Sequence, residues 1–479
     1  MTLARHFYGL SHIGPVYLVG GSLRDDILKR FSRDHDFAVP GDARAFAKKV
    51  ATQLGVQLIE IGKGSKALYR VISGDDVLDF APMAGKSIEE DLRKRDFTIN
   101  ALAYDLQSHQ LIDPVGAFHD IESKTVRLVS QDAVLADPLR MIRAFRFAAA
   151  LGFRIEPETL AVIARQSALI ARSAGERIRA ELFKMMAVEG SFHYLRQMAQ
   201  AGLLTQIIPE LQPCQGCLQG EIHGRDVFEH TMEAYKEMEA VLVGHGALWP
   251  GFVRPVANYL QAKNRKVLLK WAILLHDLGK PQTRKVEPSG RIRFLGHEAA
   301  GGRLAGHICE RLRMSGQDRS YVSLIVKNHR LPLHLFDADQ RGNLSSRGIV
   351  RFVRKYQDDL IGLLLHSVAD QRAKVRAGPE PFSALVVFLE RIFSTYFFDL
   401  KPKLAAPRLV TGHDLMRHFN LEPSELIGRL LERVEEGRLN GEIQSKQEAM
   451  EQVGRWLQLE GDAGIEPATP SSGGLCSIR

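Results

Sequence analysis

The sequence predicts an α+β protein, in which a small mixed α/β domain is followed by domains built only of helices. Short apolar runs separated by Gly and Asp turns fill the first 130 residues, as expected for strands. After about Ser130, apolar residues recur at helical spacing. The chain has 479 residues, more than one hydrophobic core usually holds, so several domains are expected.

The individual elements follow from these periodicities. Strands are expected at Val16–Val19, Asp36–Val39, Val56–Ile61, Ala67–Ile72, Val77–Phe80 and Val126–Leu128, and Thr98–Tyr104 fits either a strand or a helix. A first helix would run from a cap at Ser22 to about Lys29. Later helices are expected at Pro138–Ala150, Arg177–Val188, Phe192–Ala201, Val227–Leu242, Val267–Leu278, His297–Leu312, Ser320–His329 and Val350–Asp370. Prolines and glycines predict a loop at Leu248–Asn258 and a linker at Arg376–Pro381.

The composition is that of an ordinary globular protein with a basic surface. The net charge is +8, which favours RNA, DNA or an anionic membrane as a partner, although a merely soluble basic surface fits equally well. No run approaches the roughly 20 apolar residues that span a bilayer, and the N-terminus has no apolar signal core. The four cysteines do not form a disulfide framework, and the lone Cys214/Cys217 pair lacks further zinc ligands. We therefore expect a cytoplasmic protein.

A predicted strand that ends in two glycines is the first element with chemical meaning. Gly20 and Gly21 would let the backbone approach a phosphate, and the following helix would offer its first N–H groups. Asp34 and Asp36 come next, and residues two apart on a strand face the same side. Adjacent carboxylates repel unless a cation lies between them, and such oxygen ligands suit Mg²⁺. Each feature alone fits a plain turn, but together they predict metal-dependent nucleotidyl transfer.

Four ordered motifs carry a family resemblance. Gly20–Asp25 followed by Asp34–Asp36 resembles the signature of the polymerase-β-like nucleotidyltransferases. Within that superfamily the chain resembles class II tRNA nucleotidyltransferases and bacterial poly(A) polymerases. Glu90–Ala101 looks like their ribose-binding motif, Asp137–Phe147 like their base-recognition helix, and Gly175–Leu182 like their neck motif.

The resemblance implies roles for individual residues. Asp34 and Asp36 would be the catalytic residues and bind the metals, with Asp79 as a further carboxylate on a neighbouring strand. The residues expected at the nucleotide are Gly20, Gly21 and Arg24 at the triphosphate, Arg95, Asp96 and Asn100 at the ribose, and Asp137, Arg140 and Arg143 along the base-recognition helix. A carboxylate accepts from an exocyclic amine, which cytosine and adenine both carry, and a guanidinium donates to a ring nitrogen or carbonyl oxygen.

Two departures from the family pattern bear on which nucleotide is added. The base-recognition motif usually has Glu before its Asp, where it steadies the Arg, but this chain has Ala136. Only Ala81–Glu89 link the predicted strand to the ribose motif, whereas CCA-adding relatives have a longer flexible loop there. The short link favours addition of CC to tRNA from CTP, with full CCA addition from CTP and ATP as the alternative. A CC-adding enzyme would need a partner enzyme for the final A.

The helical half carries a second constellation. His230, His276, Asp277 and Asp370 follow the order of the HD metal-dependent phosphohydrolases, and His297 and His329 are candidate extra ligands. Imidazoles and carboxylates of this kind bind divalent transition metals. The resemblance implies hydrolysis of small phosphodiesters or phosphate esters, such as 2′,3′-cyclic ends. The alternative is a degenerate HD domain that serves only to bind RNA.

The combined prediction has five segments. They are a nucleotidyltransferase head (1–130), a helical neck for base recognition and RNA binding (131–215), an HD domain (219–376), a helical tail module near the tRNA (377–459) and a disordered end (460–479). The rival functions are a poly(A) polymerase, a phosphohydrolase with an inactive head, and a non-catalytic RNA-binding protein.

Overall fold

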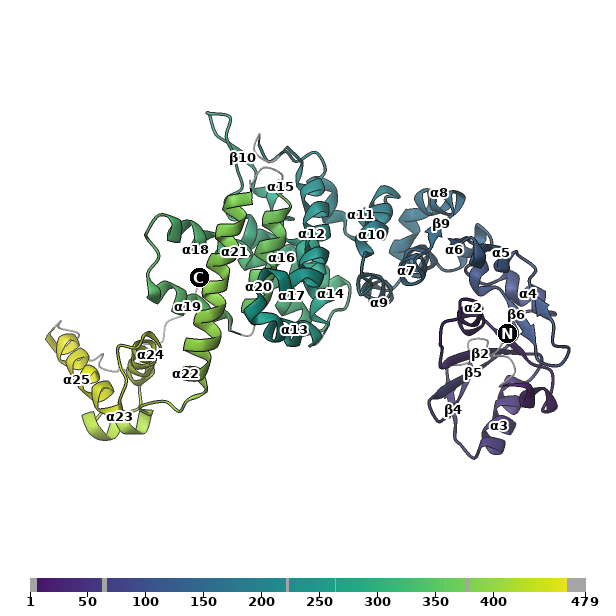
Figure 1. Ribbon diagram of the computed structural model, residues 1–479, viewed down its shortest axis with the longest axis horizontal. Coiled ribbons are helices and arrows are strands. Elements are labelled where there is room, and N and C mark those ends of the chain that lie inside the picture. Colours follow the sequence, from purple (N-terminus) through teal and green to yellow (C-terminus); the bar gives the residue numbers. More distant parts are fainter. Residues whose placement is uncertain are drawn as a thin grey trace, which may run out of the picture. The chain divides into compact units, whose positions relative to one another are not determined.

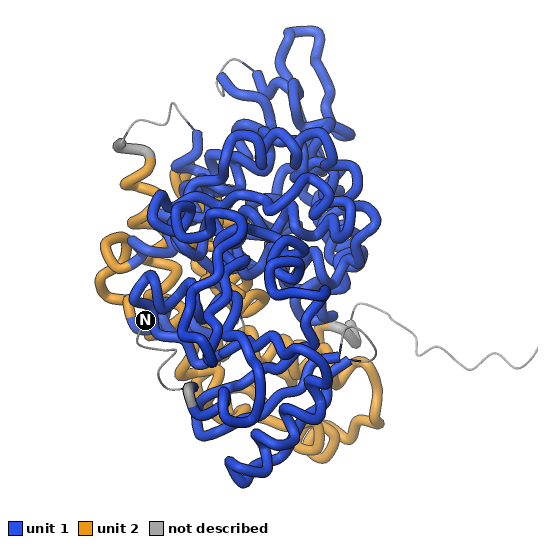
Figure 2. The backbone as a smooth tube through the Cα atoms, turned by 90° about the vertical axis from the view of Figure 1, so that its right-hand side faces the viewer, with its two compact units in different colours: residues 1–245, 254–329, 368–376 blue, residues 246–253, 330–367, 377–479 orange. Residues whose placement is uncertain are grey.

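The computed structural model describes residues 7–62, 67–220, 224–262, 264–357, 359–374 and 379–462. It confirms the α+β class, with one mixed sheet near the N-terminus and helices after it (Figure 1). The predicted disorder of 460–479 concerns residues outside this description, apart from the first three, whose backbone ends the last helix. The chain divides into two compact units, 1–245 with 254–329 and 368–376, and 246–253 with 330–367 and 377–479 (Figure 2). The five predicted segment boundaries stay a prediction.

The first unit begins with a seven-stranded sheet in the order β3-β4-β5-β2-β1-β6-β7. Its strands are β1 (Tyr17–Val19), β2 (Asp34–Val39), β3 (Leu58–Ile61), β4 (Leu68–Ser73), β5 (Asp76–Pro82), β6 (Ala103–Asp105) and β7 (Leu111–Ile112). Its helices are η1 (Tyr8–His12), α2 (Gly21–Ile27), α3 (Ala43–Leu54), α4 (Ile88–Arg93), η3 (Thr98–Asn100) and α5 (Ala117–Glu122). Among the described strands of this sheet, only β2 and β5 pair in parallel, which places Asp36 opposite Asp79.

Aromatic side chains form the core beneath the central strands. Phe37 on β2 stacks on Phe80 of β5 with ring centroids 4.9 Å apart, and Phe46 of α3 packs against Phe80 at 5.5 Å. All three rings are buried, and alternate residues of β2 face the opposite side, where Asp34 and Asp36 are exposed. The apolar core therefore fixes the strand that presents the carboxylates.

Short helices form the neck. They are α6 (Asp132–Ala136), α7 (Arg140–Leu151), α8 (Pro157–Gln166), η4 (Ser167–Arg172), α9 (Gly175–Met186), α10 (Ser191–Gln200), α11 (Leu203–Ile207) and η5 (Pro209–Cys214), with β8 (Thr125–Val126) paired to β9 (Arg154–Ile155). One face of α7 is fully apolar, from Met141 and Ile142 to Phe145 and Ala148, and is buried. The opposite face carries the arginines, so this helix presents charge toward the head.

The remaining helices of the first unit surround the predicted HD residues. They are α12 (Val227–Leu248), α13 (Val253–Gln261), α14 (Arg265–Leu275), α15 (Lys280–Thr283), α16 (His297–Arg311), α17 (Gly316–Asn328) and the end of α20 (Leu360–Arg372), with a hairpin of β10 (Lys285–Val286) and β11 (Ile292–Arg293). Helix α14 is buried from Val267 to Leu275, which explains its almost wholly apolar sequence.

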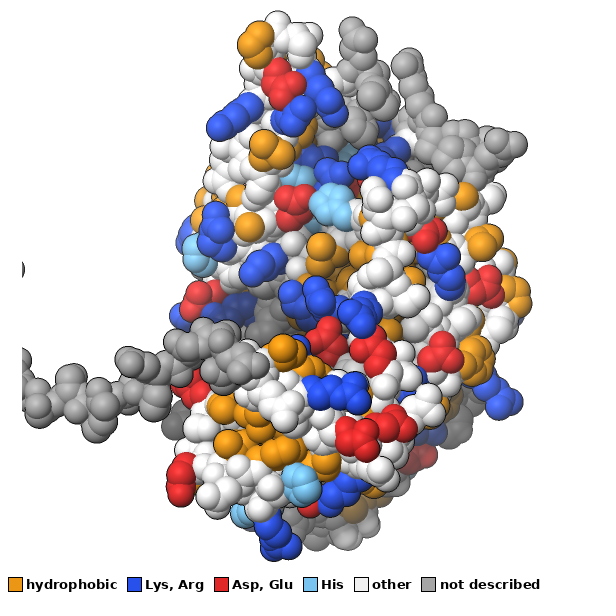
Figure 3. Space-filling view, turned by 90° about the vertical axis from the view of Figure 1, so that its left-hand side faces the viewer, with side chains coloured by type: hydrophobic (Ala, Val, Ile, Leu, Met, Phe, Trp, Pro, Cys, Tyr) orange, Lys and Arg blue, Asp and Glu red, His pale blue; other side chains and the backbone are white. Residues whose placement is uncertain are grey.

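The second unit is helical. It contains η6 (Pro250–Phe252), α18 (Leu331–Gln340), α19 (Ser346–Tyr356), α21 (Pro379–Ser394), the π-helix η7 (Thr395–Leu400), α22 (Lys401–Ala405), α23 (Gly412–Phe419), α24 (Glu425–Asn440) and α25 (Lys446–Asp462). Leu415, Leu430, Val434 and Val453 form a small core shared by α23, α24 and α25. On the face drawn in Figure 3, basic and acidic side chains lie close together above a group of exposed hydrophobic side chains.

Three local predictions are corrected. The loop expected at Leu248–Asn258 is wrong, because η6 and α13 cover most of it. Pro255 is the third residue of α13, where a helix needs no backbone N–H donor, so it does not break the helix. Helix α2 begins at Gly21 with Gly20 as its cap, so Ser22 does not cap it.

The helix expected at Val350–Asp370 is two helices. Helix α19 ends at Tyr356 and α20 begins at Leu360, and between them the Asp359 N–H donates to the Tyr356 carbonyl at 2.7 Å. The helical periodicity continues across this turn, so the hydrophobic pattern alone does not reveal the break.

Candidate nucleotide site and metal centre

A cavity of about 410 Å³ in the first unit brings together most of the predicted nucleotide-binding residues. The side chains and backbone that line it are those of Gly20, Gly21, Arg24, Asp36, Arg95, Asp96, Asn100, Asp137, Arg140, Arg143, Arg146 and Phe147. Asp34 is exposed two residues before Asp36 on the same face of β2 and does not line the cavity. Five arginines and three carboxylates in one cavity suit a polyanion held beside a cation.

Gly20 brings the backbone against the carboxylate and guanidinium groups. Its φ is +77°, a conformation that favours glycine. A Cβ at this position would lie 3.0 Å from Asp36 Oδ2 and 3.3 Å from Arg95 Nη1. The glycine is therefore required here both by its backbone angle and by the close approach of two predicted site residues.

The carboxylates on β2 and β5 lie side by side. Although part of the Asp36 side chain is open to solvent, desolvation by the surrounding protein raises its pKa, with Asp79 and Asp34 adding repulsion and Arg95 opposing it. Both oxygens of Asp79 accept hydrogen bonds from Arg70, each at 2.8 Å. A cation would relieve the repulsion on Asp36, and the oxygen donors of Asp34 and Asp36 fit Mg²⁺. Asp79 differs from the pair because a guanidinium already neutralises it.

The predicted ribose residues form one hydrogen-bonded chain. Arg24 Nη1 donates to Asn100 Oδ1 at 2.6 Å, and Asn100 Nδ2 donates to Asp96 Oδ1 at 3.1 Å. Arg143 on α7 pairs with the other oxygen of Asp96 at 2.6 Å. The triphosphate, ribose and base positions expected from the sequence are thus linked through buried polar groups before any nucleotide is added.

The base-recognition residues lie at the end of α6 and along α7, which begins at Arg140. Arg140 donates to three backbone carbonyls, those of Arg95, Ala133 and Lys94, at 3.1–3.3 Å. Asp137 pairs with Arg177 of the neck at 2.8 Å. Burial opposes charge on Asp137, but its hydrogen bonds with Arg177 and the Leu139 N–H leave its pKa below the usual value.

Sequence reasoning missed three residues here. Arg146 and Phe147 line the cavity, with the Arg146 guanidinium 3.9 Å from the Phe147 ring centroid. Arg146 and Phe147 belong to the quoted base-recognition motif, and Arg177 to the neck motif, so their motifs were recognised but not their contacts.

The predicted HD residues converge on Asp277. His230 Nε2 is 3.0 Å from Asp370 Oδ1 and 3.6 Å from Asp277 Oδ2, and His276 Nε2 is 3.1 Å from the same Asp277 oxygen. All four residues are buried. His230, His276 and Asp370 have ligand atoms within 4.8 Å of one another, as a shared metal ion requires.

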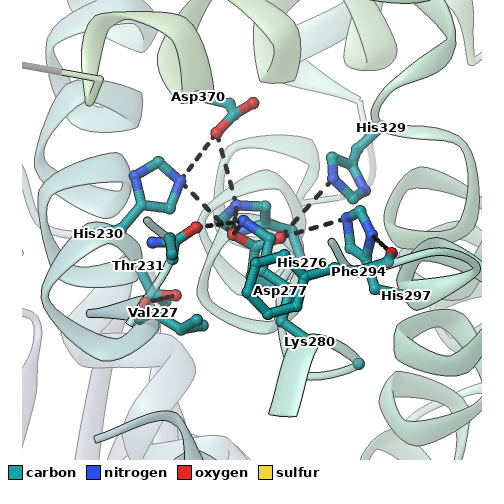
Figure 4. Close-up of polar contacts among 12 residues, drawn as sticks. Val227, His230, Thr231, His276, Asp277, Lys280, Phe294, His297, His329 and Asp370 are labelled. Carbon is teal, nitrogen blue, oxygen red and sulfur yellow. Dashed lines mark hydrogen bonds and ion pairs between the residues drawn. The ribbon is translucent and has the colours of Figure 1, made fainter. Parts of the chain in front are cut away.

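The second oxygen of Asp277 faces two further histidines. His297 Nε2 lies 3.6 Å and His329 Nε2 3.9 Å from Asp277 Oδ1. Figure 4 shows His230 on one side of Asp277 and both of these rings on the other. His276, Asp277 and His329 form a second group with ligand atoms within 4.8 Å of one another. Asp277 Oδ1 and His297 Nε2 are buried and accept or donate no hydrogen bond.

Backbone carbonyls fix the tautomers of three of these rings. The Nδ1 atoms of His276, His297 and His329 each lie 2.7 Å from the carbonyl three residues earlier. A carbonyl can only accept, so each Nδ1 carries hydrogen, and each Nε2 can bind a metal ion once it carries no hydrogen. Burial lowers the pKa of His276, but Asp277 and Asp370 outweigh it and raise that pKa to about 9. Burial would raise the pKa of Asp277, but its cationic neighbours His276 and Lys280 hold that pKa well below its usual value.

The fold and the two sites define an enzyme with a nucleotidyltransferase head and an HD domain. Residues 16–127 match the poly A polymerase head domain, and 152–215 match the probable RNA and SrmB-binding site of polymerase A. Residues 227–371 match the HD domain, and 406–453 match the putative domain 2 of tRNA nucleotidyltransferase. No helix among the described residues is both long and apolar enough to cross a membrane.

Known proteins with the same organisation cover almost the whole chain. The A-adding tRNA nucleotidyltransferase of Deinococcus radiodurans is 33% identical over 451 residues, 92% of this chain and 95% of the relative. The CC-adding tRNA nucleotidyltransferase of Thermus thermophilus is 29% identical, over 90% of this chain and 91% of the relative. The fold matches the Thermotoga maritima CCA-adding enzyme complexed with tRNA at a TM-score of 0.63 and 20% identity, over 95% and 96% of the two chains. This chain therefore belongs to the tRNA nucleotidyltransferase family.

Proposed function

We propose that this chain adds cytidine nucleotides to the 3′ end of tRNA and stops after two. The relatives are an A-adding and a CC-adding tRNA nucleotidyltransferase, which supports tRNA as the substrate. CCA-adding enzymes of the same fold form complexes with CTP and with ATP. The relatives differ in the nucleotide they add, so the choice of CC depends on a feature of this chain. That feature is the connection between β5 and α4.

The connection is short and closed by hydrogen bonds. Strand β5 ends at Pro82 and α4 begins at Ile88, which leaves residues 83–87 between them. The Ala84 N–H donates to Asp91 Oδ1 at 2.8 Å, and the Ala84 carbonyl accepts from Lys94 Nζ at 2.5 Å. A Cβ on Gly85 would lie 2.7 Å from the Glu90 Cβ. The turn has no spare length with which to rearrange the pocket between C and A addition.

The chemistry is an in-line attack by the RNA 3′ oxygen on the α-phosphorus of CTP. A new P–O bond forms, the bond to the leaving pyrophosphate breaks, and the hydroxyl proton goes to solvent. Asp34 and Asp36 would hold Mg²⁺, which when bound lowers the pKa of the attacking hydroxyl and neutralises the triphosphate. Arg24 and Arg95 bind phosphate and ribose oxygens, and Asp137 accepts a hydrogen bond from the exocyclic amine of the base.

The test is incorporation of labelled CTP and ATP, separately and together, into tRNA that ends at the discriminator base. A double Asp34→Ala/Asp36→Ala variant is the inactive control. We expect two C residues and no A. Addition of A alone to tRNA ending in CC would place the chain with the Deinococcus relative and contradict the proposal. CCA addition would refute the argument from the short turn, and long A tails would indicate a poly(A) polymerase.

A second activity, hydrolysis of phosphate esters in the HD domain, is supported by the buried cluster around Asp277. The Nε2 atoms of four histidines point at its two oxygens within 3.1–3.9 Å. Nitrogen and carboxylate ligands of this kind bind divalent transition metals, which when bound generate a hydroxide near neutral pH. We infer that 2′,3′-cyclic phosphodiesters are substrates, with the metal unspecified.

This second activity has its own test. The full chain is loaded with Ni²⁺, Co²⁺ or Mn²⁺ and assayed on a 2′,3′-cyclic nucleotide, alongside His276→Ala and Asp34→Ala/Asp36→Ala variants. We expect hydrolysis by wild type and by the head variant, and none by His276→Ala. Metal binding without hydrolysis would favour the degenerate HD domain that only binds RNA.

A further inference from the structure

Helix α9 of the neck presents two opposite charges to the base-recognition helix. Arg177 and Glu181 are four residues apart and so share one face of α9. Arg177 pairs with Asp137 at 2.8 Å, and Glu181 pairs with Arg146 at 2.5 Å. Asp137 and Arg146 line the nucleotide cavity, whereas Arg177 does not. Arg177 therefore contacts the cavity only through Asp137.

Both oxygens of Asp137 are held. Oδ2 accepts from Arg177 Nη2, and Oδ1 accepts from the Leu139 N–H at 3.2 Å. The Asp137 side chain is 29% exposed and lines the cavity, so its carboxylate can accept a further hydrogen bond there. Without Arg177, only the backbone contact would orient it.

The position of Arg177 is itself fixed. Helix α9 begins at Gly175, where a Cβ would lie 2.2 Å from the Arg311 carbonyl oxygen of α16. So close an approach holds the first turn of α9 against α16. The Arg146–Glu181 pair, with both side chains less than a fifth exposed, holds the next turn against α7. Arg177 lies between these two contacts in α9, so the backbone that carries its side chain is held in place.

The sequence lacks the usual support for the base-recognition pair. The residue before Asp137 is Ala136, whose methyl group cannot hydrogen-bond, where the family motif usually has Glu. Arg140 is instead held by the carbonyls of Lys94, Arg95 and Ala133. Besides the Leu139 N–H of its own motif, Asp137 is held by Arg177 from outside that motif.

We propose that Arg177 is a positioning residue that orients Asp137 for selection of the incoming base. The proposal rests on the proposed nucleotidyl transfer. An ionised carboxylate only accepts hydrogen bonds, so it binds the exocyclic amine of cytosine or adenine and repels the carbonyl oxygen that uracil or guanine has at the same position. A carboxylate free to turn away would discriminate less.

The test compares single-nucleotide incorporation by wild type, Arg177→Met and Arg177→Lys. Arg165→Ala is the matched control, because Arg165 is an exposed neck arginine paired with Glu158 outside the cavity. We measure kcat/KM for CTP against UTP on tRNA ending at the discriminator base. Arg177→Met should lower the amine-to-carbonyl preference about tenfold, within the range expected for one good base contact. Arg177→Lys should retain part of the preference, and Arg165→Ala all of it.

The outcomes separate this proposal from the proposed function. If wild type incorporates no nucleotide, the proposed function fails. If wild type is active and Arg177→Met and Arg177→Lys keep the full preference, the positioning role is wrong. An equal loss of kcat/KM for CTP and for UTP, with an unchanged preference between them, would also overturn it, because that is the result of a purely structural role. Thermal melting of each variant controls for folding.

Discussion

Asp91 and Arg95 are joined by two hydrogen bonds of 3.1 Å, from Arg95 Nε and Nη2 to the same carboxylate oxygen, Asp91 Oδ2. The other oxygen of Asp91 accepts the Ala84 N–H at 2.8 Å. One buried carboxylate therefore connects the short turn after β5 to a guanidinium that lines the nucleotide cavity. The turn after β5 therefore helps to hold Arg95 in place at the nucleotide cavity.

Replacing Asp91 with Asn tests this connection. An amide has one acceptor oxygen, so it cannot serve both Ala84 and Arg95, and its NH2 group faces a donor. We expect the KM for CTP to rise about tenfold and the free energy of unfolding to fall by roughly 1–3 kcal/mol. Steady-state kinetics and urea denaturation measure both. Glu89→Gln, in the first turn of the same helix, is the control, and an unchanged KM in Asp91→Asn would show that Arg95 needs no brace.

The ionised Asp36 carboxylate is expected to lower the stability of the fold while serving as a metal ligand. Because folding raises its pKa, the folded state binds this proton more tightly than the unfolded chain, and stability falls as pH rises through that pKa. Asp36→Asn should therefore melt at a higher temperature than wild type at pH 7.5 in EDTA, with a smaller difference at pH 5. Incorporation should fall about 1000-fold, since a metal ligand contributes several kcal/mol to catalysis.

The control for this prediction is Asp75→Asn, an exposed aspartate paired with Arg33 on the same domain. This variant should melt at nearly the wild-type temperature at both pH values, and it should incorporate nucleotides at nearly the wild-type rate. An Asp36→Asn variant that is less stable than wild type at pH 7.5 would contradict the conclusion that the carboxylate is strained without a cation.

Local patterns predicted the carboxylate strand because its residues are contiguous. Asp34 and Asp36 alternate with Phe37 and other core residues, and this alternation is visible in the sequence. Arg177 and Asp137 are 40 residues apart in the sequence, and a contact over that separation leaves no periodic pattern in the sequence. The same holds for Arg70, which neutralises Asp79 through strand pairing rather than spacing.

The failures of prediction have a related cause. Proline within an apolar segment usually indicates a loop, but it fits the first turn of a helix. Pro255 lies in the first turn of α13 because α13 begins at Val253, directly after η6, and the sequence pattern does not give this starting point. Thr98–Tyr104 contains both a 3-10 turn and a strand, so the two predictions for it were each half right. Patterns that report burial cannot locate a break when burial continues through it, as between α19 and α20.

A buried lysine joins the neck to the HD helices. Lys270 on α14 donates to the carbonyls of Met186 and Val188 at 2.7 and 3.0 Å, and pairs with Glu239 of α12 at 2.6 Å. Lys270→Met would leave the Glu239 carboxylate, which is only 12% exposed, without its cation, which costs about 3–5 kcal/mol. We expect a lower urea midpoint and partial recovery in Lys270→Met/Glu239→Gln. Lys266 is exposed on the same helix, so Lys266→Met should leave the urea midpoint unchanged.

The two oxygens of Asp277 predict two metal positions in the HD cluster. His230, His276 and Asp370 surround one oxygen, and His297 and His329 face the other. Titration of the EDTA-stripped Asp34→Ala/Asp36→Ala variant with Mn²⁺, followed by metal analysis, should give two tightly bound ions, because this variant lacks the head ligands and keeps the HD cluster. His297→Ala should lose one ion and keep the other, because its loss leaves the His230 side intact.

His307→Ala is the matched control for this metal count, since His307 is exposed on the same helix as His297. It should retain both ions. If His297→Ala binds as much metal as wild type, then His297 and His329 are only neighbours of a single site. If it loses both ions, the cluster binds them cooperatively through the bridging carboxylate, and His230→Ala should then show the same complete loss.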